Sequence, residues 1–296
     1  MVRLATLIAL SDLSEPARQA AARAALLARD ANAMLEVLYV LESSLLDELR
    51  RILGRTQESV ARRMVDDARE SLASFAAAAG QPFGVAAGAH LATGSLLDEI
   101  GSRADALDAD LLVLGARGAG VVRHLVLGST AERLLRKSTR SLLVVRRSPR
   151  EPYRRVLIPV DFSAWSVASM HWAAAVAPGA EITLFHAFEV PFEGKMRFAG
   201  VDEASILRYL DEMRAESAHR LRELATQAGF KSGECLSLAA HGDATTRTLE
   251  LAKERSVDLI AVGKHGRGIT EEFLLGSTTK HLLSLADCDV LVTHKR

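Results

Sequence analysis

The stretch that decides the fold reads Gly115-Ala116-Arg117-Gly118 and continues, after nine further residues, with Gly128-Ser129-Thr130. The same pattern returns as Gly263-Lys264-His265-Gly266, again followed after nine residues by Gly276-Ser277-Thr278. The two copies stand 148 positions apart. A pattern that recurs with its internal spacing intact predicts two copies of one domain in this chain of 296 residues.

The repeat extends well outside the glycine segments. Asp110-Leu111-Leu112-Val113-Leu114 matches Asp258-Leu259-Ile260-Ala261-Val262 at the same offset, and Gly94 matches Gly242. The period is far longer than that of a solenoid unit, so each copy is expected to have its own hydrophobic core.

We therefore predict a first domain over residues 1–147 and a second over residues 153–296. The segment 146–155 is rich in arginine and contains two prolines, which indicates a linker. The hydrophobic content of 49% is sufficient for two cores.

Charge and cysteine content exclude several classes of protein. The net charge is zero, which argues against a nucleic-acid partner, because such proteins usually carry a basic excess. The two cysteines lie only in the second copy and suggest a reducing compartment. The apolar run at residues 2–10 ends at Asp12 and recurs internally as a strand, so we expect neither export nor a membrane partner. The predicted location is the cytoplasm.

Short apolar runs alternate with longer amphipathic segments in both copies. The predicted strands cover residues 4–10, 34–40, 85–91, 111–114 and 142–146, and then 156–160, 182–187, 235–240, 259–262 and 290–293. The predicted helices cover residues 14–30, 44–79, 95–107 and 129–138, and then 163–176, 202–228, 243–255 and 277–286. This alternation predicts an α/β fold in which each copy is a five-stranded, doubly wound parallel sheet with helices on both faces.

The expected position of a ligand follows from this architecture. In open parallel sheets, ligands bind at the carboxyl ends of the strands, where the strand order reverses. Asp12 and Asp161 follow the first strand of each copy, and the first glycine of each motif follows the fourth. Gly115 and Gly118 are expected to let backbone N–H groups approach a ligand without an intervening Cβ. The helix that begins at Gly128-Ser129-Thr130 favours an anion at its positive end.

Each of these features also has a purely structural interpretation. Ser129 and Glu132 have the spacing of a capping box, and an aspartate after a strand commonly forms a turn or caps a helix. The constant run of nine residues between the glycines has no obvious structural necessity. Its recurrence favours contact with an anion or a nucleotide in at least one copy.

The combined pattern resembles that of the universal stress protein family in its tandem form. The resemblance rests on G-x2-G-x9-G-[ST], on the apolar runs that precede it, and on Val160-Asp161-Phe162-Ser163. It implies a strand order of 3-2-1-4-5 in each domain and ATP binding where the glycine motif is kept. It also implies that the fifth strands pair antiparallel, giving an internal pseudo-dimer; whether two chains then form a homodimer is left open.

The resemblance further implies which residues contact the nucleotide. The aspartate lies on the adenosine side, the end of the second strand offers its backbone to the adenine, and the glycine motif surrounds the phosphates. In the first copy these positions are Asp12, Val40, Gly115, Arg117, Gly118, Gly128, Ser129 and Thr130. In the second copy they are Pro159, Val160, Asp161, Ala187, Gly263, His265, Gly266, Gly276, Ser277 and Thr278.

The second copy is closer to the family pattern. It keeps His265 where the first has Arg117, and it keeps Pro159-Val160-Asp161 at the first strand. Glu132 is expected to reach back to the helix start in the first copy, where its charge would oppose a phosphate, whereas the second copy has Lys280. We predict that the second site binds nucleotide more tightly.

The predicted function is that of an ATP-binding stress-response regulator whose conformation or partner binding depends on nucleotide occupancy. The expected cofactor is ATP, with Mg²⁺ as an accompanying ion left open, and the protein partner is not identified. Neither motif has the Walker ending Gly-Lys-Ser/Thr, so at most slow ATP hydrolysis is expected. Two alternatives stay open: a slow ATPase, and an interaction module in which the motifs serve folding alone.

Overall fold

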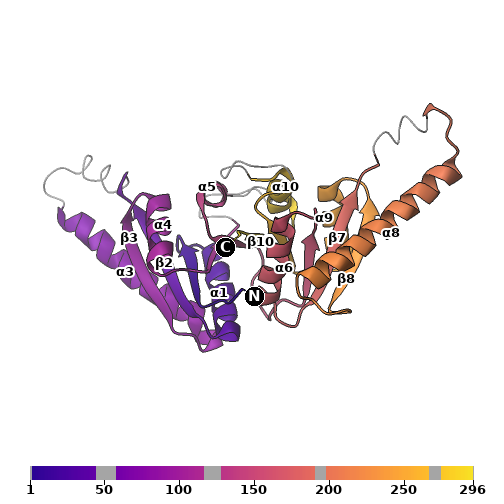
Figure 1. The fold of residues 1–296 in the computed structure, drawn as a ribbon. Helices are drawn as coiled ribbons and strands as arrows, with labels where there is room; N and C mark the ends of the chain where they lie inside the picture. The colour runs from indigo at the N-terminus through magenta and orange to yellow at the C-terminus, as the bar shows by residue number, and fades with distance from the viewer. Residues whose placement is uncertain (1, 45–57, 117–127, 191–197, 267–274, 296) are drawn as a thin grey trace. The chain divides into compact units, whose positions relative to one another are not determined.

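The computed structural model describes residues 2–44, 58–116, 128–190, 198–266 and 275–295. The chain divides into two compact units, Met1–Pro152 and Tyr153–Arg296 (Figure 1). Each unit alternates strands with helices around a parallel sheet, which confirms the predicted tandem α/β fold.

The first unit has the strand order β3-β2-β1-β4-β5, with every pairing parallel. This is the order 3-2-1-4-5 that the resemblance implies. Its elements are β1 (Thr6–Ser11), α1 (Glu15–Ala31), β2 (Met34–Glu42), α3 (Glu58–Gly80), the 3₁₀ helix η2 (Gln81–Phe83), β3 (Ala87–Gly94), α4 (Leu96–Ala106), β4 (Leu111–Gly115), α5 (Ser129–Lys137) and β5 (Ser141–Val145).

The second unit repeats this arrangement as β8-β7-β6-β9-β10, again with parallel pairings. The strand order reverses between β6 and β9, so the carboxyl ends of these two neighbouring strands mark the switch point of the sheet. Its elements are β6 (Arg155–Pro159), α6 (Ala164–Val176), β7 (Glu181–Phe188), α8 (Glu203–Gln227), β8 (Cys235–His241), α9 (Ala244–Glu254), β9 (Leu259–Gly263), α10 (Ser277–Leu285) and β10 (Asp289–Thr293).

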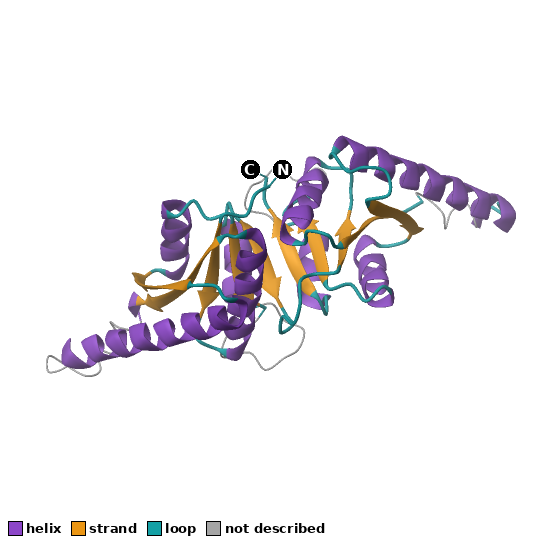
Figure 2. Cartoon of the chain, turned by 90° about the horizontal axis from the view of Figure 1, so that it is seen from below, coloured by secondary structure: helices purple, strands orange, loops and turns teal. Residues whose placement is uncertain are grey.

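Helices cover both faces of each sheet (Figure 2). In the second unit α6 and α8 pack on one face, and α9 and α10 lie together on the other. The central strand β9 is buried along its whole length, and β4 is buried from Leu111 to Leu114. Strands covered on both faces need apolar residues at every position, which explains why the sequence shows continuous apolar runs here and no alternation.

The repeated aspartate before β4 and β9 has a structural role. The Asp110 carboxylate accepts hydrogen bonds from the backbone N–H groups of Ala5 and Thr6, at 2.7 and 2.9 Å. Asp258 likewise accepts from two backbone N–H groups at the start of β6, at 2.8 and 3.0 Å. Each carboxylate joins the first strand of its unit to the fourth and so fixes the pair that flanks the switch point.

The segment between the units carries no helix or strand, since β5 ends at Val145 and β6 begins at Arg155. Tyr153 is nonetheless buried, and its hydroxyl donates to a carboxylate oxygen of Asp289 at 2.7 Å. The long helix predicted at 44–79 is observed from Glu58 onward, and residues 45–57 lie outside the described residues. The pairing of β5 with β10 stays a prediction.

Among the described residues, no helix is both long enough and apolar enough to cross a membrane.

Candidate functional site

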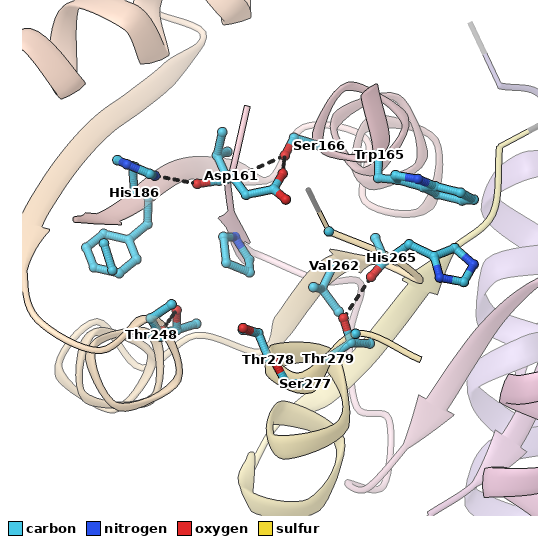
Figure 3. Close-up of a pocket in the computed structure, with 18 residues that line it drawn as sticks. Asp161, Trp165, Ser166, His186, Thr248, Val262, His265, Ser277, Thr278 and Thr279 are labelled. Atoms are coloured by element: carbon cyan, nitrogen blue, oxygen red, sulfur yellow. Dashed lines mark hydrogen bonds between the residues drawn. The ribbon is translucent and has the colours of Figure 1, made fainter. Parts of the chain in front are cut away.

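A cavity of about 270 Å³ lies at the carboxyl ends of the strands in the second unit (Figure 3). It is formed by the ends of β6, β7 and β9 and by the first turns of α6, α9 and α10. All ten residues that the sequence predicted for the second copy line it: Pro159, Val160, Asp161, Ala187, Gly263, His265, Gly266, Gly276, Ser277 and Thr278.

The turn after β6 places Asp161 at the cavity. One oxygen of its carboxylate, Oδ1, accepts hydrogen bonds from the backbone N–H of Ser163 at 3.0 Å and from the hydroxyl of Ser166 at 2.8 Å. Phe162 between them has φ of 61°, a left-handed conformation that costs a non-glycine residue about 1 kcal/mol. Asp161 is therefore both a turn-forming residue and a lining residue, so the two interpretations of this aspartate hold together.

On the opposite side, α10 begins at the cavity wall without a side-chain cap. Its N-cap residue is Gly276, and within the described residues no side chain accepts from its first turn. The neighbouring helices α8 and α9, by contrast, are capped by the carboxylates of Asp202 and Asp243. The exposed N–H groups at the start of α10, with the positive end of the helix dipole, can therefore bind an anion.

Hydrogen bonds tie the two halves of the glycine motif together. The N–H of Gly276 donates to the carbonyl of Lys264 at 3.0 Å, and the buried hydroxyl of Thr279 donates to the carbonyl of Gly263 at 2.8 Å. The N–H of Lys264 in turn donates to the carbonyl of Thr293 in β10 at 3.0 Å. The strand end and the helix start thus form one rigid wall, although residues 267–274 between them lie outside the described residues.

Packing explains why the first residue of each motif is a glycine, whereas the sequence analysis attributed it to the approach of a ligand. A Cβ on Gly263 would lie 2.6 Å from Cβ of Trp165, and a Cβ on Gly115 would lie 2.8 Å from the carbonyl oxygen of Pro16. Both positions lack a side chain because the first turn of the first helix in the unit, α1 or α6, packs directly on them. Gly266 does face the cavity, since its Cβ would lie 3.1 Å from Oδ2 of Asp161.

Aromatic and cationic groups lie on two sides of the cavity (Figure 3). At one end the His186 ring contacts the ring of Phe162 at a centroid distance of 4.6 Å, and its Nδ1 donates to the carbonyl of Val160 at 2.7 Å. At the other end the buried ring of His265 packs edge-on against Trp165 at 4.8 Å, and Nζ of Lys295 lies 5.4 Å from the centre of that indole. Trp165 is therefore a sensitive reporter of this site.

Sequence reasoning missed eight of the lining residues. They come from the first two turns of α6, α9 and α10 and from the strands β7 and β9: Trp165, Ser166, Phe185, His186, Ala244, Thr248, Val262 and Thr279. Three of the eight are buried hydroxyl residues, Ser166, Thr248 and Thr279. With the offsets of the repeat, the first unit has Ala17, Ile100 and Ala131 in their places, and all three are buried and apolar. A comparison of the two copies would have revealed this polar set.

The predicted residues of the first unit follow the same topology. Asp12 follows β1, Val40 lies in β2, Gly115 ends β4, and Gly128 to Thr130 open α5. Arg117, Gly118 and the side chain of Ser129 lie outside the described residues. The position of His186 is taken by Tyr39, whose pKa is raised by burial and, secondarily, by the charge of Asp12.

The proposed capping box of α5 is wrong. Gly128 is the N-cap residue and Ser129 is the first residue of the helix, so the serine stands one position too late to cap it. Glu132 does not reach back either, because its carboxylate accepts a hydrogen bond from Arg136 at 2.9 Å, one turn further along. The electrostatic argument for a weaker first site loses its geometric basis.

The first unit has a separate cavity of about 370 Å³ beside α4 and α5. Its lining contains none of the predicted residues and consists of Glu42, Ser43, Ser44, Gly94, Ser95, Leu96, Leu97, Asp98, Arg133 and Lys137. Among the residues that the structure describes, no cluster of three histidine, cysteine or carboxylate side chains is arranged to hold a metal ion.

Comparison with known proteins identifies the family. The sequence pattern of the universal stress protein family matches residues 6–146 and again residues 152–294. Universal stress protein A homolog 2 of Coxiella burnetii is 43% identical over 94 residues, which cover 31% of this chain and 58% of that protein's own length. A universal stress protein of Bacillus subtilis is 26% identical over 145 residues, 47% of this chain and 98% of that protein.

Several solved structures match both units together. A universal stress protein from Archaeoglobus fulgidus covers 98% of this chain, and 98% of that chain is matched, with a TM-score of 0.70 and 17% sequence identity. At this level of identity the likeness shows the fold alone.

Proposed function

The chain belongs to the universal stress protein family, and we propose that its second unit binds an adenine nucleotide, with ATP as the physiological ligand. One observation carries the proposal. Ten residues that were assigned to a nucleotide from the sequence pattern line a single cavity at the switch point of the sheet. Among these residues are the glycine motif and the uncapped start of α10, which suit the phosphates of a nucleotide.

The two ends of the cavity suit the two ends of a nucleotide. The end near β6 and β7 is lined by Val160, Phe185 and Ala187, which offer apolar contacts to a base. The other end has the uncapped start of α10 and the backbone of Gly266, which offer N–H groups to phosphates. The volume of about 270 Å³ matches the nucleoside part better than a complete nucleoside triphosphate, so the phosphates would extend toward the open side.

We assign the tighter binding to the second unit. The three buried hydroxyls of its cavity wall donate to Asp161 and to the carbonyls of Ala244 and Gly263, and apolar side chains replace them in the first unit, which therefore lacks these bonds that hold the wall in place. A nucleotide held in this way acts through its different affinity for two conformations or for two partner-bound states. The proposed role is therefore regulation in response to stress, with the bound nucleotide as the signal.

Tryptophan fluorescence can test the proposal because the chain has only two tryptophans. Trp165 lines the cavity, whereas Trp172 is buried and donates from Nε1 to the carbonyl of His294 at 3.3 Å. In a Trp172→Phe variant, titrated ATP is expected to change the remaining emission in a saturable way. In a Trp165→Phe variant the change should disappear while calorimetry still detects binding.

The same titration separates the alternatives. No saturable response and no heat of binding with ATP, ADP or AMP would contradict nucleotide binding and favour an interaction module. Release of inorganic phosphate that is lost in Gly276→Asp would favour the slow ATPase. Binding without phosphate release is the result that a regulatory role requires.

A further inference from the structure

We propose that Arg220 is a positioning residue for the nucleotide of the second unit and acts through the rings of Phe162 and His186. The inference rests on the proposed function and adds to it a residue outside the cavity that sets the affinity. Arg220 lies on α8, apart from the glycine motif, and is not among the described residues that line the cavity.

Three side chains from separate parts of the second unit form a chain of contacts that ends at the cavity. The guanidinium carbon of Arg220 lies 4.1 Å from the centre of the Phe162 ring. That ring contacts the ring of His186 at a centroid distance of 4.6 Å, and His186 lines the cavity. A hydrogen bond of 2.7 Å between Nδ1 of His186 and the carbonyl of Val160 holds the same ring from β6. Arg220 therefore reaches the cavity wall through two rings.

The chain of contacts ends on the side of the cavity away from the glycine motif. In the sheet β6 separates β7 from β9, so the ends of β7 and β9 lie about 10 Å apart, two strand spacings. The glycine motif begins at the end of β9. Figure 3 accordingly shows His186 and His265 on opposite sides of Asp161. The contacts of Arg220 therefore bear on the nucleoside part of the ligand and not on its phosphates.

The first unit shows that the turn after the first strand does not need these contacts. Leu13 adopts φ of 63° where Phe162 has 61°, so the same left-handed turn forms around a different side chain. Ser71 precedes the buried Leu72 of α3 as Arg220 precedes the buried Leu221 of α8. All three contact residues are thus replaced in the first unit, where Leu13, Tyr39 and Ser71 stand for Phe162, His186 and Arg220. This favours a role at the cavity over a role in the turn.

The size of the effect follows from the exposure of the contact. Arg220 is exposed and Phe162 is half-buried. A guanidinium over an aromatic ring at an exposed site contributes an energy that corresponds to about a two- to fivefold change in affinity. The guanidinium also covers one face of the Phe162 ring and so restricts its movement, which keeps this ring against His186 at the cavity wall.

The test starts with two substitutions of Arg220 and two nucleotides, ATP and AMP, titrated by calorimetry. Arg220→Gln removes the cation and is expected to weaken both nucleotides by the same factor, about threefold, because they share the nucleoside. Arg220→Lys keeps a cation over the ring and should restore most of the affinity. Arg222→Gln is the matched control, since Arg222 is an exposed arginine of the same helix, and it should leave both affinities unchanged.

A double-mutant cycle then tests whether Arg220 acts through Phe162. Phe162→Leu introduces the residue that the first unit has in the same turn, so the backbone is expected to tolerate it. In this background Arg220→Gln should no longer change the affinity for ATP or AMP, because the ring that transmits the effect is gone. Thermal unfolding of each variant shows whether the chain is folded.

An equal loss from Arg220→Gln with and without the Phe162 ring would overturn the inference, and so would a loss confined to ATP, which would place Arg220 at the phosphates. Unchanged affinities in Arg220→Gln would overturn it as well, while nucleotide binding would stand. Failure of the wild-type chain to bind either nucleotide would instead overturn the proposed function, and with it this inference.

Discussion

Gly276→Asp is expected to weaken ATP binding by the second unit by about 100-fold without destabilising the chain. Gly276 is the N-cap residue of α10, with φ of −58° and ψ of 143°, a conformation that any residue adopts. A Cβ there would meet its nearest atoms at 3.6 Å, which is ordinary contact. The aspartate therefore fits, and aspartate is a good N-cap residue.

The variant loses affinity because the new carboxylate occupies the anion site itself. It accepts from the N–H groups at the start of α10 and places a negative charge where the phosphates would lie. Loss of charge-assisted hydrogen bonds worth about 3 kcal/mol corresponds to somewhat more than a factor of 100 in affinity.

Calorimetric titration of ATP measures the affinity, and thermal unfolding of the same samples tests the fold. Gly276→Asn is the control for charge, because it caps the helix without adding one, and it should lose less affinity than Gly276→Asp. Gly128→Asp makes the same change in the first unit, and it should reduce the affinity of the chain for ATP less than Gly276→Asp does. A larger loss from Gly128→Asp would reverse the ranking of the two units.

Gly263→Ala is expected to destabilise the second unit by about 1–3 kcal/mol, the usual cost of an overpacked core position. The added Cβ would lie 2.6 Å from Cβ of Trp165 and 3.1 Å from the carbonyl oxygen of His265. Neither atom is the end of a flexible side chain, so α6 or the turn after β9 must move. Because that turn carries part of the cavity wall, ATP affinity should fall as well.

Gly101→Ala is the matched control, and it is expected to raise the stability of the chain. Gly101 lies in the interior of α4, and a Cβ added to it would meet no atom within 4 Å. Replacing a helical glycine by alanine in open space stabilises a protein by about 0.5–1 kcal/mol. The midpoint of urea unfolding, measured by circular dichroism, should therefore rise for Gly101→Ala and fall for Gly263→Ala. Equal effects would show that the close packing at Gly263 does not constrain the strand end.

The elements of this fold could be predicted because their sequence signals are local. Continuous apolar runs such as residues 259–262 are typical of strands covered on both faces, and β9 is observed over Leu259–Gly263. The alternation of strands with helices predicts that the strands run parallel. The family resemblance predicts the order of the strands in each sheet. The ten predicted residues of the second site lie together because strand ends and helix starts meet at one edge of a parallel sheet.

What sequence reasoning missed depends on tertiary packing. The helical periodicity predicts that Thr248 faces inward. It cannot predict that this part of the helix lies beside a cavity. The one indication in the sequence is that the second copy has a threonine where the first copy has the apolar Ile100. The capping box failed by one residue because glycine itself can occupy the N-cap position. Gly263 does line the cavity, but its close packing against Trp165 could not be predicted because the two residues lie far apart in the sequence.

The central claim is that an adenine nucleotide binds in the cavity of the second unit. Photolabelling with 2-azido-ATP, followed by peptide mapping with and without excess ATP, tests it most directly because the reactive group sits on the base. We expect the label in peptides that contain β7 or α9, next to Ala187 and Thr248, and we expect excess ATP to prevent this labelling. ATP-protected label confined to the first unit, or no ATP-protected label at all, would contradict the account.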